Sequence, residues 1–557
     1  MIVSRRHCLQ LSALVAGGVG AGLARAAGTG TVPARYQPAV AALKRYIDLH
    51  LAAYSLPGIT VALADGEGFS TTLTAGWADV ERRRPVTPAH YFQIGSISKS
   101  LAALAVLRLV DEGRLSLADD VRTHLPEIRM VDGKPFTIRH LLTHSSGLPA
   151  DAPLGPRGAD GAFWQGFDPG SQFSYSNIGY QMIGLIVAKA RGKSYTDALA
   201  EDVLRPLGMG EAFPAIRAAD RDHYAPGYAP YYADRLYARG GRLGPGPNIS
   251  VTEAAGCVAA PPGVMAVYLQ WLIASAAGKG APLLKPETRK LFTAPAIEAA
   301  EFGAGAHYAL GLAVLPLDDR PVLYHTGGML AYSSSLMVDE ATGVGAFASV
   351  NARAEDNYRP RQVTAYAVRL MRAVRENKPP PPIPPIRSAT KLDDARKLAG
   401  TYRAADGATL ELVAAGDGLA IRRGAALLPM QSAGDGQFTV VGPGDQTSGL
   451  RIEMDNGAVR SVGWGSVLYG AAASAVPDAL ARCAGLYDGG NPWVGMMEVV
   501  ARPDGLWLGG TTPLVPLADG SFRVGSDAWS PERVRFDLEI DGQPQRMNFS
   551  GADLLRV

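Results

Sequence analysis

The spacing of apolar residues along the chain changes at a proline-rich stretch, residues 378–387. Before it, long apolar runs predict buried elements: a helix over residues 98–113 that ends at a glycine, a turn leading into an apolar helix over residues 182–188, and a strand over residues 332–338. After it, short alternating runs are separated by Asp-Gly and Asn-Gly turns. The pattern therefore predicts a mixed α and β domain first and β domains after it.

The part of the chain beyond the prolines contains an internal repeat, visible when it is laid on itself at an offset of about 85 residues. Tyr402 then aligns with Tyr487, and Phe438 aligns with Phe522. Each copy is long enough for a small closed antiparallel barrel of about eight strands, which removes exposed sheet edges. We therefore predict barrels over residues 388–474 and 478–557, with residues 379–387 as an extended proline linker.

The N-terminus has the features of an export signal. Arg5 and Arg6 precede a mildly apolar run through Leu23, and residues 24–26, Ala-Arg-Ala, offer small side chains for cleavage. We interpret residues 1–26 as a twin-arginine signal peptide and expect a periplasmic or secreted protein. The apolar run is too short to be a membrane-spanning helix, so no membrane span is expected.

The charge of the mature chain argues against two classes of partner. Removing residues 1–26 takes away three arginines and no acid, so the formal charge changes from +2 to −1. Nucleic acids and anionic membranes are bound by basic patches, which a nearly neutral chain gives no reason to expect. Cys257 and Cys483 remain in different predicted domains, where we expect buried free thiols rather than a disulfide.

Residues 95–100, Gly-Ser-Ile-Ser-Lys-Ser, place a serine and a lysine three positions apart at the start of the first predicted helix. On a helix of about 3.6 residues per turn these side chains lie one above the other, so the Lys99 amine can reach the Ser96 hydroxyl. A lysine can take that proton only if its surroundings lower its pKa from about 10.4 by roughly three units. The spacing predicts a nucleophilic serine in a tight, partly dry site.

Two later segments carry groups that such a serine needs. Tyr175 and Asn177 lie two apart in a turn, where the phenol can act as acid or base and the amide can bind the substrate. His325 is followed by Gly327 and Gly328, and glycines let a backbone approach a substrate closely. We expect an edge strand at these glycines to supply an oxyanion-binding N–H group.

With these motifs the chain resembles the serine β-lactamase and penicillin-binding-protein superfamily, in particular the class C β-lactamase-like group of esterases, D-aminopeptidases and D,D-carboxypeptidases. The matching segments are Ser96 to Lys99, Tyr175-Ser176-Asn177, His325-Thr326-Gly327, and residues 144–149, His-Ser-Ser-Gly-Leu-Pro. The resemblance covers about residues 35–375. It implies an α+β catalytic domain, which we place at residues 33–378, with an antiparallel sheet flanked by helices and a helical subdomain. A catalytic domain followed by two barrels is similar to the layout of the D-aminopeptidases.

The resemblance implies a serine hydrolase that cleaves a small ester, amide or peptide-like substrate through an acyl-serine, without a metal or organic cofactor, and the N-terminal signal adds that it is exported. Ser96 would attack the carbonyl carbon, and Lys99 and Tyr175 would move its proton. N–H groups of Ser96 and of the strand near Gly328 would hold the oxyanion. Which of Lys99 and Tyr175 is the working base stays open, and so does the oligomeric state.

Several functions remain open at this point. They are an esterase, a D-stereospecific aminopeptidase or D,D-peptidase, a β-lactamase, and a penicillin-recognising binding protein without turnover. The intact set of catalytic groups argues against the last. An aminopeptidase needs a carboxylate for the substrate ammonium group, and Asp220, Asp222, Glu253 or a barrel residue could supply it.

His325 departs from the pattern of β-lactamases and transpeptidases, which usually have a lysine at this position. Lysine is charged near neutral pH, whereas histidine, with a pKa of about 6.5, is often neutral. We therefore expect a weaker hold on substrate carboxylates, so that small esters or amides are better substrates than β-lactams and peptides with a terminal carboxylate. The His-x-Gly variant is similar to that of D-aminopeptidases and esterases in the group.

The remaining motifs have structural explanations. His140 and His144 lie four apart but lack the third ligand of a zinc motif, so we predict packing or capping and no metal site. Trp493, Trp507 and Trp529 are expected to be core or rim aromatics of the second barrel. We also expect loops of one barrel to cover the Ser96 cleft and limit substrate size.

Overall fold

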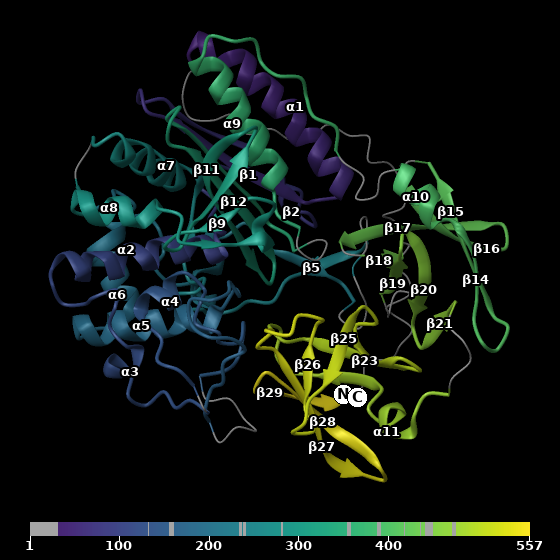
Figure 1. Ribbon diagram of the computed structural model, residues 1–557. Helices are drawn as coiled ribbons and strands as arrows, with labels where there is room; N and C mark the ends of the chain where they lie inside the picture. Colours follow the sequence, from purple (N-terminus) through teal and green to yellow (C-terminus); the bar gives the residue numbers. More distant parts are fainter. Residues whose placement is uncertain are drawn as a thin grey trace, which may run out of the picture.

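An antiparallel sheet of nine strands forms the centre of the N-terminal part of the chain (Figure 1). The structure is a computed structural model that describes residues 32–131, 133–154, 161–232, 237, 241–279, 282–353, 358–386, 392–416, 418–434, 436–440, 449–470 and 475–557. The interpreted signal peptide, residues 1–26, lies outside these ranges. From one edge to the other the strands are β3 (Arg84–Pro85), β2 (Ser70–Asp79), β1 (Gly58–Asp65), β13 (Val344–Val350), β12 (Tyr332–Asp339), β11 (Arg320–Met329), β10 (Ala313–Leu317), β9 (His307–Tyr308) and β8 (Ile297–Glu298).

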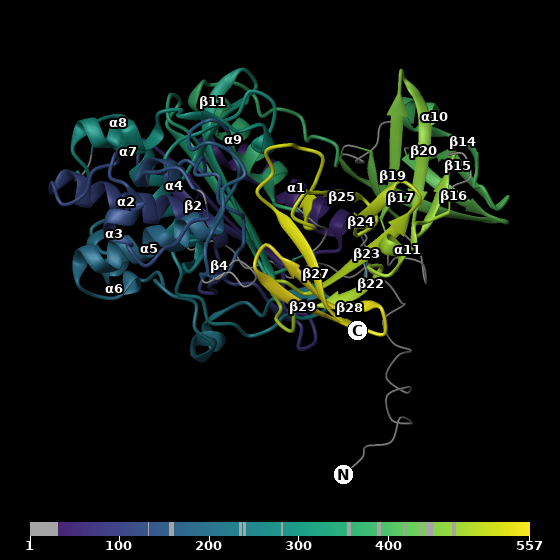
Figure 2. The same cartoon turned by 60° about the horizontal axis from the view of Figure 1, so that its bottom comes forward.

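The two faces of this sheet are covered by different helices, as Figures 1 and 2 show from two sides. On one face α1 (Gln37–Tyr54) and α9 (Arg361–Arg375) pack side by side, and Val61 of β1 belongs to their apolar core. On the other face α7 (Pro262–Ala276) packs against the sheet, and Ala62 belongs to that core. Successive side chains of a strand point to opposite faces, so the apolar residues of β1 serve both cores, Val61 on one face and Ala62 on the other.

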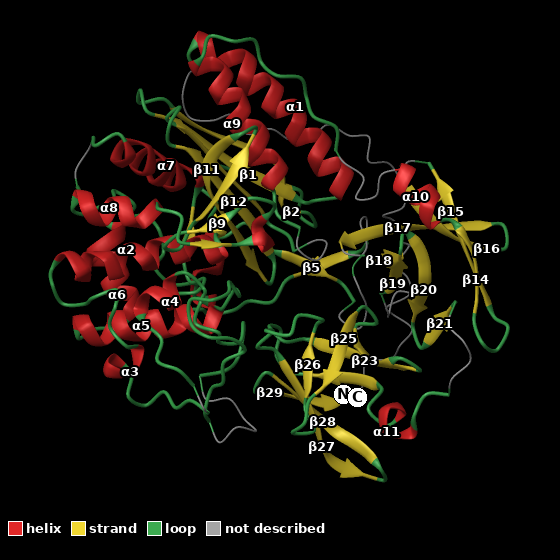
Figure 3. Cartoon of the chain, viewed as in Figure 1, coloured by secondary structure: helices red, strands yellow, loops and turns green. Residues whose placement is uncertain are grey.

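A helical subdomain extends from the α7 face, and it stands out in the colouring of Figure 3 by its helices. Its centre is α2, which is buried almost throughout and ends close to Gly113 as the sequence predicts. The helices of this part are α2 (Ser98–Asp111), α3 (Val121–His124), α4 (Ile138–Leu142), α5 (Asn177–Arg191), α6 (Tyr195–Leu199) and α8 (Pro286–Thr293). Short 3₁₀ helices are η1 (Ala34–Tyr36), η2 (Gly95–Ile97), η4 (Ala218–His223) and η5 (Ala300–Phe302), and η3 (Ala200–Leu204) continues α6 as a π-helix. Two short ladders pair β4 (Phe92–Gln93) with β7 (Ala259–Ala260) and β5 (Tyr228–Pro230) with β6 (Leu243–Pro245).

The first repeat forms an antiparallel sheet of eight strands in chain order, preceded by α10 (Leu392–Leu398). The strands are β14 (Gly400–Arg403), β15 (Thr409–Ala415), β16 (Gly418–Arg423), β17 (Ala426–Gly434), β18 (Gln437–Val440), β19 (Leu450–Asp455), β20 (Ala458–Trp464) and β21 (Val467–Tyr469). A single bridge between Ala404 and Tyr469 joins its two ends, so the sheet is nearly closed. The predicted two-residue turn is present between β19 and β20, with positive φ at both Asn456 and Gly457.

The second repeat forms a closed antiparallel barrel, preceded by α11 (Asp478–Ala481). Its strands are β22 (Gly485–Asp488), β23 (Met496–Arg502), β24 (Gly505–Leu508), β25 (Thr512–Pro516), β26 (Phe522–Val524), β27 (Arg533–Ile540), β28 (Gln543–Phe549) and β29 (Ala552–Arg556). Pairing of β22 with β29 closes the barrel. Together the three parts confirm the predicted fold class, an α+β domain followed by two small antiparallel β-barrel units.

The barrels contact each other and the N-terminal domain. Arg502 is fully buried and donates to the carbonyl of Gly465 in the first barrel. The second barrel approaches the N-terminal domain (Figure 2), and there Trp164 donates its indole N–H to the carbonyl of Pro531 at 2.7 Å. Within the described ranges none of the helices is long and apolar enough to cross a membrane.

Candidate active site

Ser96 is placed by the η2 turn, which presses against β11 of the sheet. Gly95 adopts a positive φ of 55°, and a Cβ there would lie 2.8 Å from the Gly328 nitrogen. Only glycine combines this backbone conformation with so close a contact. The turn therefore holds the backbone of Ser96 directly beside Gly327 and Gly328.

Lys99 lies in the first turn of α2 and is fully buried. Its Nζ lies 3.0 Å from Ser96 Oγ, 2.6 Å from Asn177 Oδ1 and 2.8 Å from the carbonyl oxygen of Ala255. Burial lowers the pKa of Lys99 to about 7, and nearby Asp151 opposes that change. The shift agrees with the roughly three units that a lysine base requires.

Tyr175 and Asn177 complete the group around the serine. Tyr175 is hydrogen-bonded to Ser96, and burial raises the pKa of its phenol above the ordinary value. Asn177 is the first residue of α5, and its Nδ2 donates to Asp151 Oδ1 at 2.7 Å. The Asn177 amide is thus held on both sides, by Lys99 and by Asp151.

His325 is brought close to this group but not into its cavity. The side chain is fully buried, its Nδ1 donates to the carbonyl of Thr326 at 2.6 Å, and its Nε2 therefore accepts from the Tyr308 hydroxyl at 2.9 Å. Burial, followed by the charge of Lys99, lowers the pKa of His325 to about 3. The ring is consequently neutral and has no free proton to offer a substrate.

A cavity of about 880 Å³ opens onto Ser96. Tyr324, Thr326 and Gly328 of β11 line it, whereas His325 does not. The other lining residues are His50, Tyr54, Tyr175, Asn177, Glu301, Phe302, Tyr358, Arg359, Arg361 and Gln362. The sequence analysis missed the charged members of this set because no motif marks them: Glu301 lies in η5, and Arg359 and Arg361 lie at the start of α9.

The expectation of an edge strand at the two glycines is corrected by the sheet order. β11 is an interior strand, since it pairs with β12 on one side and β10 on the other. β10 pairs with it only from Arg320 to Tyr324, however, whereas the pairing with β12 continues to Met329. The segment from His325 to Gly328 therefore has an open side next to Ser96, because β10 ends early.

His140 and His144 have the structural roles that the sequence suggested. His140 forms a capping box with Thr137 at the start of α4. His144 is buried beyond the helix, accepts the Ser176 N–H at 3.0 Å, and lies with its ring centre 4.2 Å from that of Tyr175. Among the described residues, no three His, Cys, Asp or Glu side chains are grouped as a metal site would require. Cys257 and Cys483 are buried free thiols.

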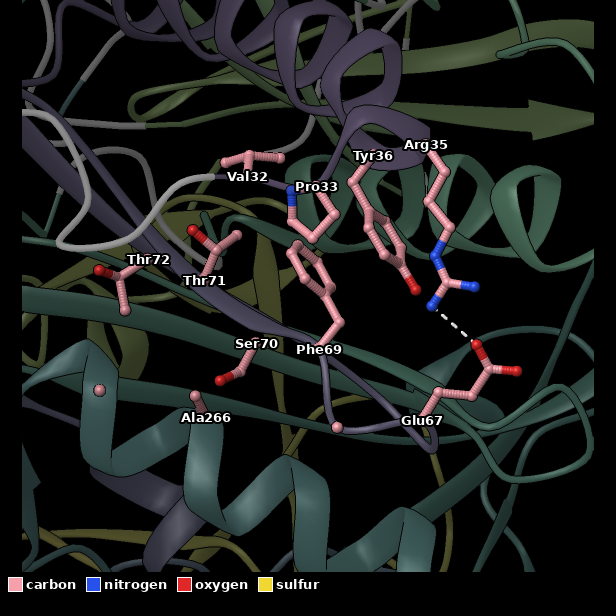
Figure 4. A pocket seen from close by; sticks show the side chains of 12 residues that line it. Val32, Pro33, Arg35, Tyr36, Glu67, Phe69, Ser70, Thr71, Thr72 and Ala266 are labelled. Atoms are coloured by element: carbon pink, nitrogen blue, oxygen red, sulfur yellow. Dashed lines mark ion pairs between the residues drawn. The ribbon is translucent and has the colours of Figure 1, made fainter.

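A second cavity, of about 610 Å³, lies where η1 meets the β1–β2 hairpin (Figure 4). Tyr36 and Phe69 stack there with ring centres 3.7 Å apart, and Arg35 pairs with Glu67 at 2.7 Å. Hydroxyl groups of β2 line this cavity, but its lining includes no lysine or histidine. Its carboxylate, Glu67, is paired with Arg35 and Arg375, which lower its pKa and make it a weak base, so the Ser96 cavity is the candidate active site.

Comparison with known proteins shows the family to which the chain belongs. The family model described as Beta-lactamase matches residues 43–370, and the chain belongs to the beta-lactamase family. Penicillin-binding protein 4* of Bacillus subtilis is 32% identical over 191 residues, 30% of this chain and 41% of its own length. Protein flp of Staphylococcus aureus strain N315 is 30% identical over 169 residues, 28% of this chain and 34% of its own length. The chain thus matches well under half the length of these relatives.

Among solved structures, the octameric penicillin-binding protein homologue from Pyrococcus abyssi superposes with a TM-score of 0.55 at 24% identity. The match covers 77% of this chain and 99% of that one. At this identity the likeness concerns the fold.

The contact between Gly327 and the Ser96 turn gives a prediction. A Cβ on Gly327 would overlap the Ile94 carbonyl oxygen, which is backbone and cannot give way easily. We expect Gly327→Ala to lower the free energy of unfolding by about 1–3 kcal/mol. It should also move Ser96 and lower kcat/KM for 4-nitrophenyl acetate by at least about tenfold.

Denaturant unfolding and ester kinetics check this prediction. Gly263→Ala is the control, because a Cβ on this helical glycine meets no atom within 4 Å. The control should be neutral or slightly stabilising. If Gly327→Ala were as stable and as active as the wild-type protein, the tight contact between Gly327 and the Ile94 carbonyl would be contradicted.

Proposed function

We propose that the protein is an exported serine hydrolase that cleaves a small ester or amide through an acyl-serine intermediate. The observation that carries this proposal is the buried Lys99 amine, 3.0 Å from Ser96 Oγ and with its pKa lowered to about 7. A lysine at its ordinary pKa of about 10.4 is almost wholly protonated near neutral pH. With a pKa near pH 7, about half of the molecules hold a free amine that can accept a proton.

The contacts of Lys99 favour it over Tyr175 as the base. A neutral amine has two N–H groups and one lone pair, and Asn177 Oδ1 and the Ala255 carbonyl can accept from the two N–H groups. The lone pair is then directed at the Ser96 hydroxyl, which donates to it. The raised pKa of Tyr175 keeps its phenol protonated, which suits a proton relay or acid.

In the proposed reaction, Ser96, Lys99 and Tyr175 exchange the protons that the chemistry requires. Ser96 Oγ bonds to the substrate carbonyl carbon, its proton passes to Lys99, and the carbonyl electron pair moves onto oxygen. When the intermediate collapses, the bond to the leaving group breaks, and the leaving group takes a proton from the Lys99 ammonium, directly or through Tyr175. A water molecule then attacks the acyl carbon and gives a proton to Lys99 or Tyr175. The bond from that carbon to Ser96 Oγ breaks, Oγ takes the proton back, and the carboxylic acid is released.

Backbone donors for the oxyanion are proposed at Ser96 and Gly328. Gly95 lies against Gly327 and Gly328, which places the two backbone segments side by side. The side of β11 without a β10 neighbour lies at this point. Loss of one such donor typically costs about 2.7–4 kcal/mol of transition-state stabilisation.

The substrate preference rests on His325. Its ring is neutral with a pKa of about 3, and both nitrogens are engaged with Thr326 and Tyr308. It therefore supplies no charge for a carboxylate beside Ser96. Arg359 and Arg361 also line the cavity, so the expected preference concerns a carboxylate placed at the position of His325 and not one that reaches these guanidinium groups.

We expect the purified protein to hydrolyse 4-nitrophenyl acetate with a kcat/KM at least about tenfold above that for nitrocefin. A fluorophosphonate probe should form a covalent adduct on Ser96, located by mass spectrometry of the peptides. Equal rates on the two substrates would reject the preference for uncharged substrates. Absence of both adduct and turnover would reject the hydrolase and favour a binding protein.

A D-stereospecific aminopeptidase is the second candidate, favoured by Glu301. Of the acids considered from the sequence, Asp220, Asp222 and Glu253 do not line the cavity, whereas Glu301 does. Its carboxylate accepts the backbone N–H of Tyr175, and burial raises its pKa. Turnover of D-alanine 4-nitroanilide that is lost in Glu301→Gln, with ester hydrolysis retained, would select this function.

The proposal of export rests on the sequence alone. Arg5 and Arg6 form the paired arginines of the signal. Replacing both by lysine should retain the protein in the cytoplasm with residues 1–26 uncleaved, as cell fractionation and N-terminal sequencing would show.

A further inference from the structure

A loop of the second barrel docks beside the candidate active site. The loop joins β26 to β27, and the ring of Trp529 contacts that of Phe167 edge-on at 5.8 Å. The Pro531 carbonyl accepts the Trp164 indole N–H at 2.7 Å. These contacts place the last residue of the loop, Glu532, against the segment of the N-terminal domain at Ala150.

Glu532 is held between the two domains by both oxygens of its carboxylate. Oε1 accepts the backbone N–H of Ala150 at 2.7 Å, and Oε2 accepts the hydroxyl of Ser550 in its own barrel. Burial raises the pKa of Glu532, and the hydrogen bonds from Ser550 and Ala150 oppose this. The side chain is thus a bridge fixed at both ends rather than a solvated surface acid.

The Ala150 segment in turn fixes the start of α5. The Ala150 carbonyl accepts the N–H groups of Asn177 at 2.7 Å and Ile178 at 3.2 Å, two of the donors that a helix N-terminus leaves without a partner. The next residue, Asp151, accepts from Asn177 Nδ2 at 2.7 Å. Because the Asp151 carboxylate binds the side-chain nitrogen of Asn177, the amide must turn its oxygen the other way. Asn177 Oδ1 therefore faces Lys99 Nζ, 2.6 Å away.

An unbroken path therefore runs from the barrel to the reacting amine. It passes from Glu532 to Ala150, through the chain to Asp151, and from Asn177 to Lys99. Each step is a hydrogen bond of 2.6–2.7 Å or a covalent connection. Two of these bonds have a carboxylate acceptor, and such charge-assisted hydrogen bonds are the stronger ones in proteins, so this part of the path resists displacement.

We infer that Glu532 is a positioning residue, through which the docked second barrel holds Asn177 and Lys99 in the arrangement that activates Ser96. The inference rests on the proposed hydrolase function. When the bridge is cut, Ala150 and Asp151 can shift, and the amine loses its alignment with the hydroxyl. A displacement of about 1 Å in a catalytic group can cost about a hundredfold in rate.

A matched pair of substitutions at Glu532 tests this inference. In Glu532→Gln the amide oxygen can still accept from Ala150 and the amide nitrogen can donate to Ser550, whereas Glu532→Met has a similar shape but offers neither bond. We expect Glu532→Met to lower kcat for 4-nitrophenyl acetate about 10–100-fold with KM within about threefold of the parent. Glu532→Gln should keep kcat within about threefold.

Trp164→Phe is the control for domain docking. It removes the hydrogen bond to Pro531, which lies in the same interface but outside the path to Lys99. We expect its kcat to stay within about threefold of the parent, even if the interface is weakened. A loss in Trp164→Phe as large as that in Glu532→Met would overturn the inference, because general docking would then explain both.

Two further measurements keep the test decisive. If Glu532→Met does not fold, Ser550→Ala frees the second carboxylate oxygen from within the barrel and should lower kcat about three- to tenfold at unchanged KM. An unchanged kcat in the folded variant overturns the inference. Fluorophosphonate labelling of Ser96 in the parent is a separate measurement. No adduct and no turnover in the parent would reject the hydrolase proposal, whereas an active parent with an unaffected Glu532→Met variant would reject only the role of Glu532.

Discussion

Replacing Ser96 by alanine should abolish hydrolysis of 4-nitrophenyl acetate, lowering kcat by a factor on the order of 10⁴ to 10⁶. The variant removes the only atom that can form the acyl bond in the proposed mechanism, while its neighbours Lys99 and Tyr175 stay in place. Ser96 lies in a turn whose shape is set by Gly95 and by the contact with β11, not by the hydroxyl. The fold should therefore be retained.

Steady-state kinetics and intact-protein mass spectrometry measure the Ser96→Ala result. Ser98→Ala is the control, because Ser98 is a buried serine two residues away whose Oγ accepts the N–H of Val258, whereas the Lys99 amine is hydrogen-bonded to Ser96, Asn177 and Ala255. It should retain the fluorophosphonate adduct. If Ser96→Ala still formed the fluorophosphonate adduct, or turned over substrate at the rate of the parent, Ser96 would not be the nucleophile.

Replacing Lys99 by methionine should lower kcat/KM by about 10²–10⁴-fold, the range that a general base contributes. In the parent, kcat/KM should rise with pH through an inflection near 7, because the pKa of Lys99 is lowered to about 7 and only the free amine accepts the serine proton. This inflection should be absent from the residual activity of Lys99→Met. A profile with the same inflection in both proteins would assign it to another group.

Stability gives an independent readout of the buried lysine. Its pKa is about 7 in the folded protein and about 10.4 in the unfolded chain, so between these pH values the unfolded state binds more protons. The parent should therefore gain stability relative to Lys99→Met as pH rises from 7 to 10, by up to about 1.4 kcal/mol per pH unit. Below pH 7 the difference should be constant, because both states of the parent are protonated. Denaturant unfolding at several pH values measures this, and a difference independent of pH would contradict the lowered pKa.

The contact between Ser96 and Lys99 could be predicted from the sequence because it is local. Three residues on a helix fix the relation of two side chains whatever the rest of the fold does. The two barrels were predictable for a similar reason, since a repeat and a two-residue turn such as Asn456-Gly457 act within short segments.

The remaining parts of the site depend on distant segments. The direction of the His325 side chain follows from the position of Tyr308 on β9, and the open side of β11 follows from where β10 ends. Arg359 reaches the cavity because α9 packs on the sheet. The link from Glu532 to Asn177 joins residues more than 350 positions apart in the chain. Contacts between residues so far apart in the sequence leave no local pattern from which they could be predicted.

The order of strands in the central sheet also bears on how the protein folds. β13 is the last of these strands to be synthesised, yet it lies in the middle of the sheet, between β1 near the N-terminus and β12. Chain closure over nearly 300 residues must precede that pairing, which is a slow, high-contact-order step. During translation the hydrophobic faces of β1 and α1 thus stay without their final neighbours until β13 and α9 have left the ribosome, a period in which chaperone protection would be most valuable.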